Sequence, residues 1–121
     1  MARIMIAEDS EGTRMLIRDW MEIKNHEIVS EVETGTDAVT EFNNKKPDIL
    51  LLDIAMPKKD GITVLKEIKT TNPDAKVIML TANEDQNMIA QCAEYGSLAY
   101  LIKPFDEEQL MAAIAMALDE L

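Results

Sequence analysis

The chain has 121 residues, of which 47% are hydrophobic and 29% are charged, a composition typical of one globular domain and not of a disordered chain. Its formal net charge of −11 disfavours binding to nucleic acid or insertion at anionic membranes, because both surfaces are themselves negative. No apolar run approaches the length of a membrane span, there is no signal-peptide pattern, and the 1 cysteine cannot form an internal disulfide. We therefore expect one cytoplasmic domain over residues 1–121, with proteins or cations as partners.

Short β-branched and apolar segments alternate with amphipathic segments along the whole chain. Strands are predicted at 3–7, 27–32, 49–53, 76–81 and 99–102, and helices after them at 11–24, 37–46, 62–71, 83–95 and 106–121. A fivefold strand–helix alternation predicts a parallel sheet with helices on both faces and right-handed crossovers. The expected fold class is α/β, a flavodoxin-like (βα)5 three-layer sandwich whose five strands lie in the order 2-1-3-4-5.

Residue spacing predicts which side of each helix is buried. The expected inward residues are Leu16, Trp20 and Ile23 in the first helix, Ala38, Val39 and Phe42 in the second, Leu65 and Ile68 in the third, and Leu110, Ala113, Ile114, Ala117, Leu118 and Leu121 in the last. The last helix also carries a second apolar face, made of Met111, Ala112, Ala115 and Met116. This second face indicates a contact surface, although small apolar groups are also tolerated on a solvated surface.

Polar residues mark the ends of several predicted helices. Ser10 is expected to accept the first free amides of the first helix, and Asp106 with Gln109 has the spacing of a capping box. Asn83 with Gln86 has the same spacing and predicts a cap for the fourth helix. Asn25 and Gly96 are expected to adopt left-handed conformations at helix carboxyl ends.

The stretch from Ile49 to Pro57 is an apolar run that ends on a carboxylate, Asp53. Such a run is typical of a strand buried on both faces, so Asp53 is expected where that strand ends. In open parallel sheets, ligands bind at the carboxyl ends of the strands, where the strand order reverses. Because strands one and three lie side by side in the expected order, Glu8 and Asp9 should converge on Asp53 at this edge.

Three neighbouring carboxylates repel each other by about 4 kcal/mol per pair at 4 Å and an effective dielectric of 20, so the group favours a bound cation. An all-oxygen set of ligands favours Mg²⁺ and offers nothing soft for zinc or copper. Thr81 and Lys103 end the next two strands and add a hydroxyl and an ammonium. A carboxylate nucleophile, Mg²⁺, a lysine and a hydroxyl together are the groups that phosphoryl transfer requires.

Several motifs, in order along the chain, resemble the receiver domain of response regulators in two-component signalling. They are the acidic pair Glu8–Asp9, Asp53 followed by Met56–Pro57 and Gly61, Thr81–Ala82, and Tyr100 to Phe105 with Lys103–Pro104. The resemblance covers essentially the whole chain and implies the CheY-like version of the predicted fold. Glu8 stands where an aspartate is more frequent in that family, and Ala55 offers no polar side chain two residues after Asp53.

The resemblance also implies roles for individual residues. Asp53 would accept a phosphoryl group from a phosphohistidine of a sensor histidine kinase or of a histidine phosphotransfer protein. Asp9, Asp53 and the backbone carbonyl of Ala55 would bind Mg²⁺, with Glu8 acting through water.

Further roles implied by the resemblance concern signal transmission. Lys103, before a cis peptide bond, would contact the phosphoryl group. Thr81 and Tyr100 would form the switch, and helix four, strand five and helix five would form the surface for a downstream protein target or for dimerisation. The chain would thus be a signalling domain without an enzymatic reaction beyond its own phosphorylation and dephosphorylation.

Several alternatives remain open. The chain is expected to be a stand-alone chemotaxis-type or phosphorelay regulator, but it could also be a receiver excised from a longer protein. A haloacid dehalogenase-type hydrolase also uses an aspartyl phosphate, but its Asp-x-Asp pattern after strand one is not matched by Glu8–Asp9–Ser10. A receiver that binds partners without chemistry is disfavoured because all five polar site residues are present. Cys92 is expected in the core and His26 on the surface.

Overall fold

The computed structural model describes residues 1–119, which form one five-stranded parallel sheet flanked by five helices. The strands are β1 (Arg3–Ala7), β2 (Glu27–Val32), β3 (Ile49–Asp53), β4 (Val77–Thr81) and β5 (Ala99–Ile102). Their order across the sheet is β2-β1-β3-β4-β5, which confirms the predicted strand order. The central position of β3 explains its apolar sequence, because neighbouring strands cover both of its edges and helices cover both of its faces.

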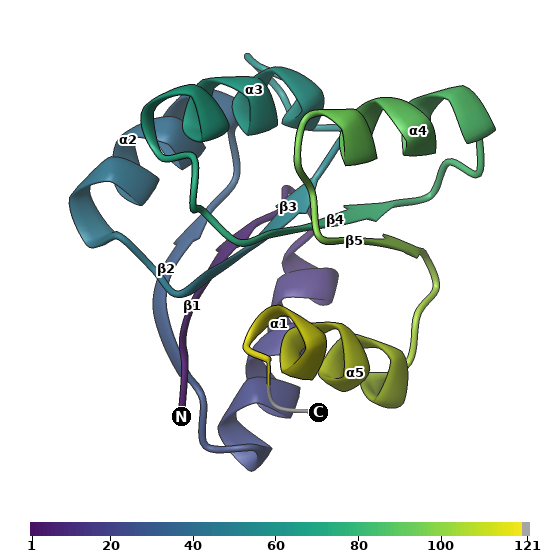
Figure 1. Ribbon diagram of the computed structural model, residues 1–121. Helices are drawn as coiled ribbons and strands as arrows, with labels where there is room; N and C mark the ends of the chain where they lie inside the picture. The colour runs from purple at the N-terminus through teal and green to yellow at the C-terminus, as the bar shows by residue number, and fades with distance from the viewer. Residues whose placement is uncertain (120–121) are drawn as a thin grey trace.

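The helices lie in two layers, one on each face of the sheet (Figure 1). They are α1 (Glu11–Ile23), α2 (Gly35–Lys45), α3 (Gly61–Thr71), α4 (Gln86–Glu94) and α5 (Glu107–Ala117). Helices α1 and α5 cover one face, and α2, α3 and α4 cover the other. The three-layer α/β sandwich predicted from the strand–helix alternation is therefore confirmed.

Alternate residues of the central strands face opposite helix layers, as the pleat of a strand requires. In β3, Ile49 and Leu51 pack with α1 and α5, whereas Leu50 and Leu52 pack with α2 and α3. The β1–β3 register pairs Ala7 with Leu52. Because the next residue of each strand is acidic, this register brings Glu8 to the level of Asp53.

The predicted inward faces of α2 and α3 are confirmed, but that of α1 is wrong. Leu16 and Ile23 are 47% and 68% exposed, and the buried residues of α1 are Arg14, Ile17 and Met21. The apolar stripe that begins at Leu16 and the stripe that contains Ile17 are offset by one residue in sequence, which is a rotation of about 100° around the helix axis. Packing against β1 and β3 selects the second stripe. Trp20 is half-buried at its edge and contacts Phe105, with ring centroids 6.2 Å apart.

Most of the predicted helix ends are confirmed, with one exception at α4. Asp106 and Gln109 form the expected capping box, while Asn25 and Gly96 have φ angles of 61° and 97°. Helix α4 is capped by Asp85 and not by Asn83, whose side-chain oxygen instead accepts a hydrogen bond from the Asp85 amide at 2.7 Å. The Asn83 side chain thus stabilises a turn, and the helix begins only after Asp85, at Gln86.

Other expectations have mixed outcomes. Helix α5 ends at Ala117, before the predicted end, and Leu121 lies outside the described residues. Cys92 is buried as expected. His26, expected on the surface, is half-buried, and its Nδ1 atom accepts a hydrogen bond from the Ala2 amide at 3.0 Å. No helix within residues 1–119 combines the length and the hydropathy needed to cross a membrane.

Candidate functional site

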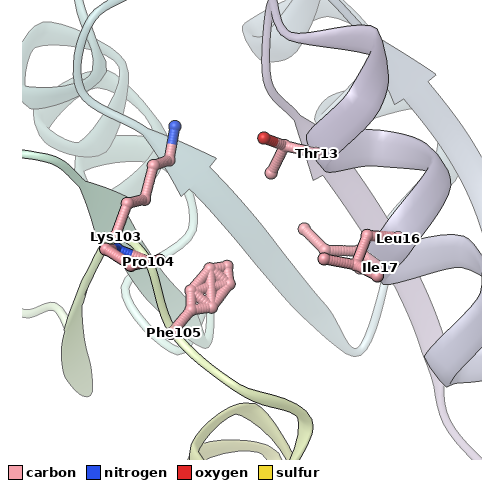
Figure 2. A pocket seen from close by; sticks show the side chains of 6 residues that line it. All are labelled: Thr13, Leu16, Ile17, Lys103, Pro104 and Phe105. Atoms are coloured by element: carbon pink, nitrogen blue, oxygen red, sulfur yellow. The ribbon is translucent and has the colours of Figure 1, made fainter.

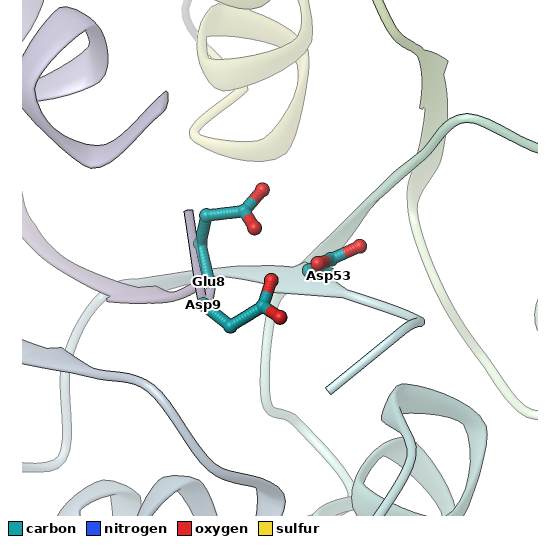
Figure 3. A group of neighbouring side chains, drawn as sticks. All are labelled: Glu8, Asp9 and Asp53. Atoms are coloured by element: carbon teal, nitrogen blue, oxygen red, sulfur yellow. The ribbon is translucent and has the colours of Figure 1, made fainter. Parts of the chain in front are cut away.

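Three carboxylates lie together where β1 and β3 end (Figure 3). One oxygen from each of Glu8, Asp9 and Asp53 lies within 4.8 Å of the others. Glu8 is fully buried and Asp53 is 4% exposed, whereas Asp9 is exposed. Two of these carboxylates are thus removed from water, and the third lies at the opening of the site.

Lys103 brings a positive charge to the same place from the end of β5. Its backbone amide donates a hydrogen bond to the carbonyl of Thr81 at 2.7 Å, and its peptide bond to Pro104 is cis. The Nζ atom forms an ion pair with Glu8 and lies 3.5 Å from Oδ1 of Asp53. We refer to Glu8, Asp9, Asp53 and Lys103 as the acidic cluster, which has three carboxylates against one ammonium.

Burial and charge shift the pKa values of the two buried carboxyl groups in opposite directions. Burial, together with the adjacent Glu8, raises the pKa of Asp53 to about 7, although Lys103 partly opposes this shift. Burial also acts to raise the pKa of Glu8, but hydrogen bonds that favour its charged form outweigh it, the Lys103 ion pair first among them, and hold the pKa below its ordinary value. Glu8 is therefore the more readily ionised of the two carboxyl groups. The repulsion between them is expressed as the raised pKa of Asp53.

The loop after β3 is held close beneath Asp53. The Ala55 amide donates a hydrogen bond to Oδ1 of Asp53 at 3.3 Å, and the Gly61 amide donates one to the carbonyl of Ile54 at 2.8 Å. A Cβ atom at Gly61 would lie 2.2 Å from the carbonyl oxygen of Asp53. Gly61 is therefore required by the close approach of two backbone segments, and this approach fixes the loop that contains Ala55.

Thr81 and Tyr100 both form hydrogen bonds to the backbone of Asn83, in the segment that follows β4. The buried Oγ1 atom of Thr81 accepts a hydrogen bond from the Asn83 amide at 3.1 Å. The half-buried Tyr100 donates its hydroxyl to the carbonyl of Asn83 at 2.9 Å. Both side chains thus hold the β4–α4 connection, one from each side of the same residue.

An apolar pocket lies next to the acidic cluster, between α1 and the segment that follows β5 (Figure 2). It has a volume of about 370 Å³ and is lined by Thr13, Leu16, Ile17, Lys103, Pro104 and Phe105. Sequence reasoning placed Leu16 in the core, but this residue lines the pocket. The correct helical phase of α1 would have left Leu16 outside and indicated an exposed apolar position beside the site.

Sequence reasoning also missed Arg14, which is 8% exposed and donates a hydrogen bond to the backbone of Glu8. The spacing of Arg14, Ile17 and Met21 would have found it, because residues three and four apart share one face of a helix. An arginine on the inward face of a helix is unusual and indicates partners that the helix itself does not supply.

The donor set of the site fits a hard divalent cation. Three carboxylate oxygens converge within 4.8 Å, one of them from the exposed Asp9, and no histidine or cysteine within residues 1–119 belongs to the group. This set suits Mg²⁺, which prefers oxygen ligands and retains several waters.

Comparisons with known proteins agree with this geometry. Residues 4–115 match the family described as the response regulator receiver domain. The chemotaxis protein CheY of Bacillus subtilis is 37% identical over 117 residues, which cover 97% of this chain and 98% of that protein. CheY of Thermotoga maritima is 32% identical over 112 residues, which cover 93% of each chain.

A solved structure, the CheX-CheY-BeF3-Mg+2 complex from Borrelia burgdorferi, contains a similar chain. It has a TM-score of 0.93 and 28% sequence identity, and the match covers 96% of this chain and 88% of that chain. The family is one of signalling domains in two-component systems. On the match over nearly its whole length and on its CheY relatives, the chain belongs to the response regulator receiver domain family.

Proposed function

We propose that the chain is a Mg²⁺-dependent phosphoacceptor that receives a phosphoryl group on Asp53. The observation that carries the proposal is the position of Asp53 at the end of β3, with two further carboxylates within 4.8 Å and the Lys103 ammonium 3.5 Å away. A structural carboxylate would be satisfied by neighbours that balance its charge. Asp53 instead lies among like charges, which is typical of a site that binds a cation and an anion together.

In the proposed reaction, a carboxylate oxygen of Asp53 attacks the phosphorus atom of a phosphohistidine. A P–O bond forms, the P–N bond breaks with its electron pair going to the imidazole nitrogen, and that nitrogen takes a proton from solvent. The donor is a sensor histidine kinase or a histidine phosphotransfer protein. Lys103 would donate to a phosphoryl oxygen, since its Nζ atom already lies between Glu8 and Asp53.

Asp9, Asp53 and the carbonyl of Ala55 are the proposed direct ligands of Mg²⁺, and Glu8 is the proposed ligand through water. The exposure of Asp9 and the burial of Glu8 support this division, because Glu8 is already engaged by Lys103 and by the Ser10 amide at 3.1 Å. Mg²⁺ at this position supplies positive charge for the oxygens of the phosphoryl group. CheY of the Borrelia burgdorferi complex, which is similar to this chain, is found together with Mg²⁺ and BeF3.

Signal transmission is proposed to run through Thr81 and Tyr100 to the surface formed by α4, β5 and α5. The Thr81 Oγ1 atom accepts a hydrogen bond from the Asn83 amide, and the Thr81 hydroxyl would donate to a phosphoryl oxygen. Apolar side chains support a protein contact there: Met116 is 41% and Leu98 43% exposed, and Ala112 is also exposed. A downstream target or a second copy of the chain would bind this surface in the cytoplasm.

Intact-mass measurement after incubation with Mg²⁺ and acetyl phosphate tests the proposal. We expect one added phosphoryl group on the parent protein and none on Asp53→Ala. Asp48→Asn, at the opposite end of β3, is the matched control and should be modified like the parent. Modification of Asp53→Ala, or an unmodified parent, would contradict the proposal. Size-exclusion chromatography of the same samples, with Met116→Glu as a further variant, tests dimerisation through the apolar surface.

A further inference from the structure

Arg14 is the buried cation of helix α1, and its position next to the acidic cluster is not explained by packing alone. Its side chain is 10% exposed, on the same helix face as Ile17 and Met21. Arginine is seldom buried unless its donors are fully engaged, because removing the charge from water is energetically unfavourable. The partners of Arg14 therefore indicate what the residue does.

The guanidinium of Arg14 joins three parts of the fold. Its Nη1 atom donates a hydrogen bond to the backbone carbonyl of Glu8 at 2.7 Å, directly after β1. Its Nη2 atom donates to Oε1 of Glu33 at 2.9 Å, and its Nε atom lies 3.6 Å from Oε1 of Glu31. One rigid, planar group thus connects α1 with the ends of β1 and β2.

The positive charge of Arg14 is already balanced by its own surroundings. Arg14, Arg18, Glu31 and Glu33, which we call the arginine cluster, contain two guanidinium groups and two carboxylates. Arg18 binds both oxygens of Glu31, at 2.8 and 2.7 Å. The contribution of Arg14 to the neighbouring acidic cluster is therefore a directed hydrogen bond and not an uncompensated charge.

The hydrogen bond to Glu8 fixes the peptide plane that precedes Asp9. The carbonyl of Glu8 and the amide of Asp9 belong to one planar peptide unit, whose orientation sets the direction in which the Asp9 side chain leaves the backbone. On the other side of the same residue, the Glu8 amide donates to the carbonyl of Val32 at 3.0 Å. Glu8 is thus held at both backbone groups, and the Arg14 hydrogen bond restricts the orientation of the peptide unit that precedes Asp9.

We infer that Arg14 is a positioning residue for the divalent cation of the acidic cluster, acting through the Glu8–Asp9 peptide unit. This inference rests on the proposed function, because it assumes that Asp9 binds the cation. Mg²⁺ requires near-octahedral geometry, whereas Ca²⁺ accepts six to eight oxygens in a flexible arrangement. Loss of Arg14 is therefore expected to weaken Mg²⁺ binding more than Ca²⁺ binding.

Isothermal titration calorimetry with Mg²⁺ and with Ca²⁺ tests the inference on the whole chain. Removing a group that orients a metal ligand typically costs roughly 10- to 100-fold in affinity. Arg14→Met should weaken Mg²⁺ binding by about 10-fold, with a smaller loss for Ca²⁺. Arg14→Lys keeps the charge but loses the planar fork, and it should still weaken Mg²⁺ binding by about threefold or more.

Arg18→Met is the matched control, because Arg18 belongs to the same cluster and its side chain donates its hydrogen bonds to Glu31. Its Mg²⁺ and Ca²⁺ affinities should equal those of the parent. Circular dichroism first establishes that each variant is folded. If Arg14→Met is unfolded, Arg14→Lys tests the inference instead. Its loss of Mg²⁺ affinity relative to the parent should again exceed its loss of Ca²⁺ affinity.

The outcomes separate the inference from the proposed function. A parent that binds no Mg²⁺, or that binds it as tightly as Asp9→Asn does, would overturn the metal site and the inference with it. Weak binding by Asp9→Asn together with parent-like binding by the folded Arg14 variants would overturn the inference alone. Equal losses of Mg²⁺ and Ca²⁺ affinity would also overturn it, because a general disturbance of the site does not distinguish the two ions.

Discussion

Two charged clusters lie next to each other at the carboxyl end of the sheet, joined by the hydrogen bond from Arg14 to the backbone carbonyl of Glu8, but they differ in charge balance. In the arginine cluster, each carboxylate contacts a guanidinium, and the charges cancel. In the acidic cluster, three carboxylates share the single ammonium of Lys103. The first arrangement is complete within the protein, whereas the second becomes balanced only when a further cation binds.

The pKa values of Glu31 in the arginine cluster and Asp53 in the acidic cluster are shifted in opposite directions. The hydrogen bond from Arg18 lowers the pKa of Glu31, although burial opposes it. Burial and the adjacent Glu8 raise the pKa of Asp53 to about 7. A carboxylate with a lowered pKa stabilises the fold when charged, and one with a raised pKa destabilises it when charged. The balanced cluster therefore supports the structure, and the unbalanced one is available for binding.

The largest expected effect on the free energy of unfolding comes from replacing Asp53 with a neutral residue, measured in the presence of EDTA. The folded state holds the Asp53 proton up to a pH of about 7, compared with an ordinary pKa of 3.8. Between these values the folded state binds more protons than the unfolded state, so the free energy of unfolding falls as pH rises. Asp53→Asn removes this dependence and should be about 2 to 4 kcal/mol more stable than the parent at pH 8.

Urea denaturation at about pH 5 and pH 8 measures this difference. The parent should lose stability over the interval relative to Asp53→Asn, and the control Asp48→Asn should keep the slope of the parent. Parallel pH dependence of the parent and Asp53→Asn would mean that the acidic cluster carries no excess charge in the folded state. The two clusters would then not differ in the way argued above.

A smaller effect is expected from Lys103→Met, because the Lys103 side chain is 24% exposed and its ion pairs are partly screened. Without Mg²⁺, the loss of the ammonium leaves Glu8 and Asp53 without their cation and should destabilise the fold by about 1 to 2 kcal/mol. Mg²⁺ should then raise the melting temperature of the variant more than that of the parent, because Mg²⁺ no longer competes with Lys103 for the carboxylates.

Thermal denaturation with EDTA and with Mg²⁺ measures both parts of this prediction. Lys24→Met, at the exposed carboxyl end of α1, is the control for loss of a lysine and should respond to Mg²⁺ like the parent. A smaller Mg²⁺ response in Lys103→Met than in the parent would show that Lys103 helps to hold the cation instead of substituting for it.

The strand order and both helix layers could be predicted from the sequence because they depend on local patterns. The apolar run of β3 and the fivefold alternation each indicate a position in the sheet without knowledge of neighbours. The phase of α1 could not be predicted in this way, because its two apolar stripes are equally good locally. Contacts of Ile17 and Met21 with the sheet decide between them, and those contacts exist only in the folded chain.

The candidate site also has one part that could be predicted from the sequence and one part that could not. Glu8, Asp53 and Lys103 follow strands, and strand ends meet at one edge of a parallel sheet, so the sequence indicates that they are neighbours. The contact of Arg14 with Glu33 spans 19 residues and joins a helix to a loop. The cap of α4 depends on a side-chain turn at Asn83. Helical spacing places Arg14 on the inward face of α1 but does not identify its partners, and the turn has no periodic signal, so both sets of contacts became evident only from the structure.

The smallest expected effect on stability comes from a substitution in the arginine cluster. Glu31→Gln keeps an oxygen that can accept from Arg18, and the Glu31 side chain is 23% exposed, so the loss of its charge should cost less than about 1 kcal/mol at neutral pH. The lowered pKa of Glu31 gives this contribution a definite pH range. It is fully present above the ordinary pKa of 4.5 and is lost as pH falls through the lower pKa of the folded state.

Urea denaturation of the parent and Glu31→Gln, at about pH 7 and again below about pH 4, measures this contribution. The difference between the two proteins should shrink on acidification, whereas the difference between the parent and Asp53→Asn should shrink over a higher pH range and have the opposite sign. High salt should reduce the Glu31 effect further, because exposed ion pairs are screened. A difference that grows at low pH would mean that Glu31 is strained by its neighbours, and the arginine cluster would then not be balanced.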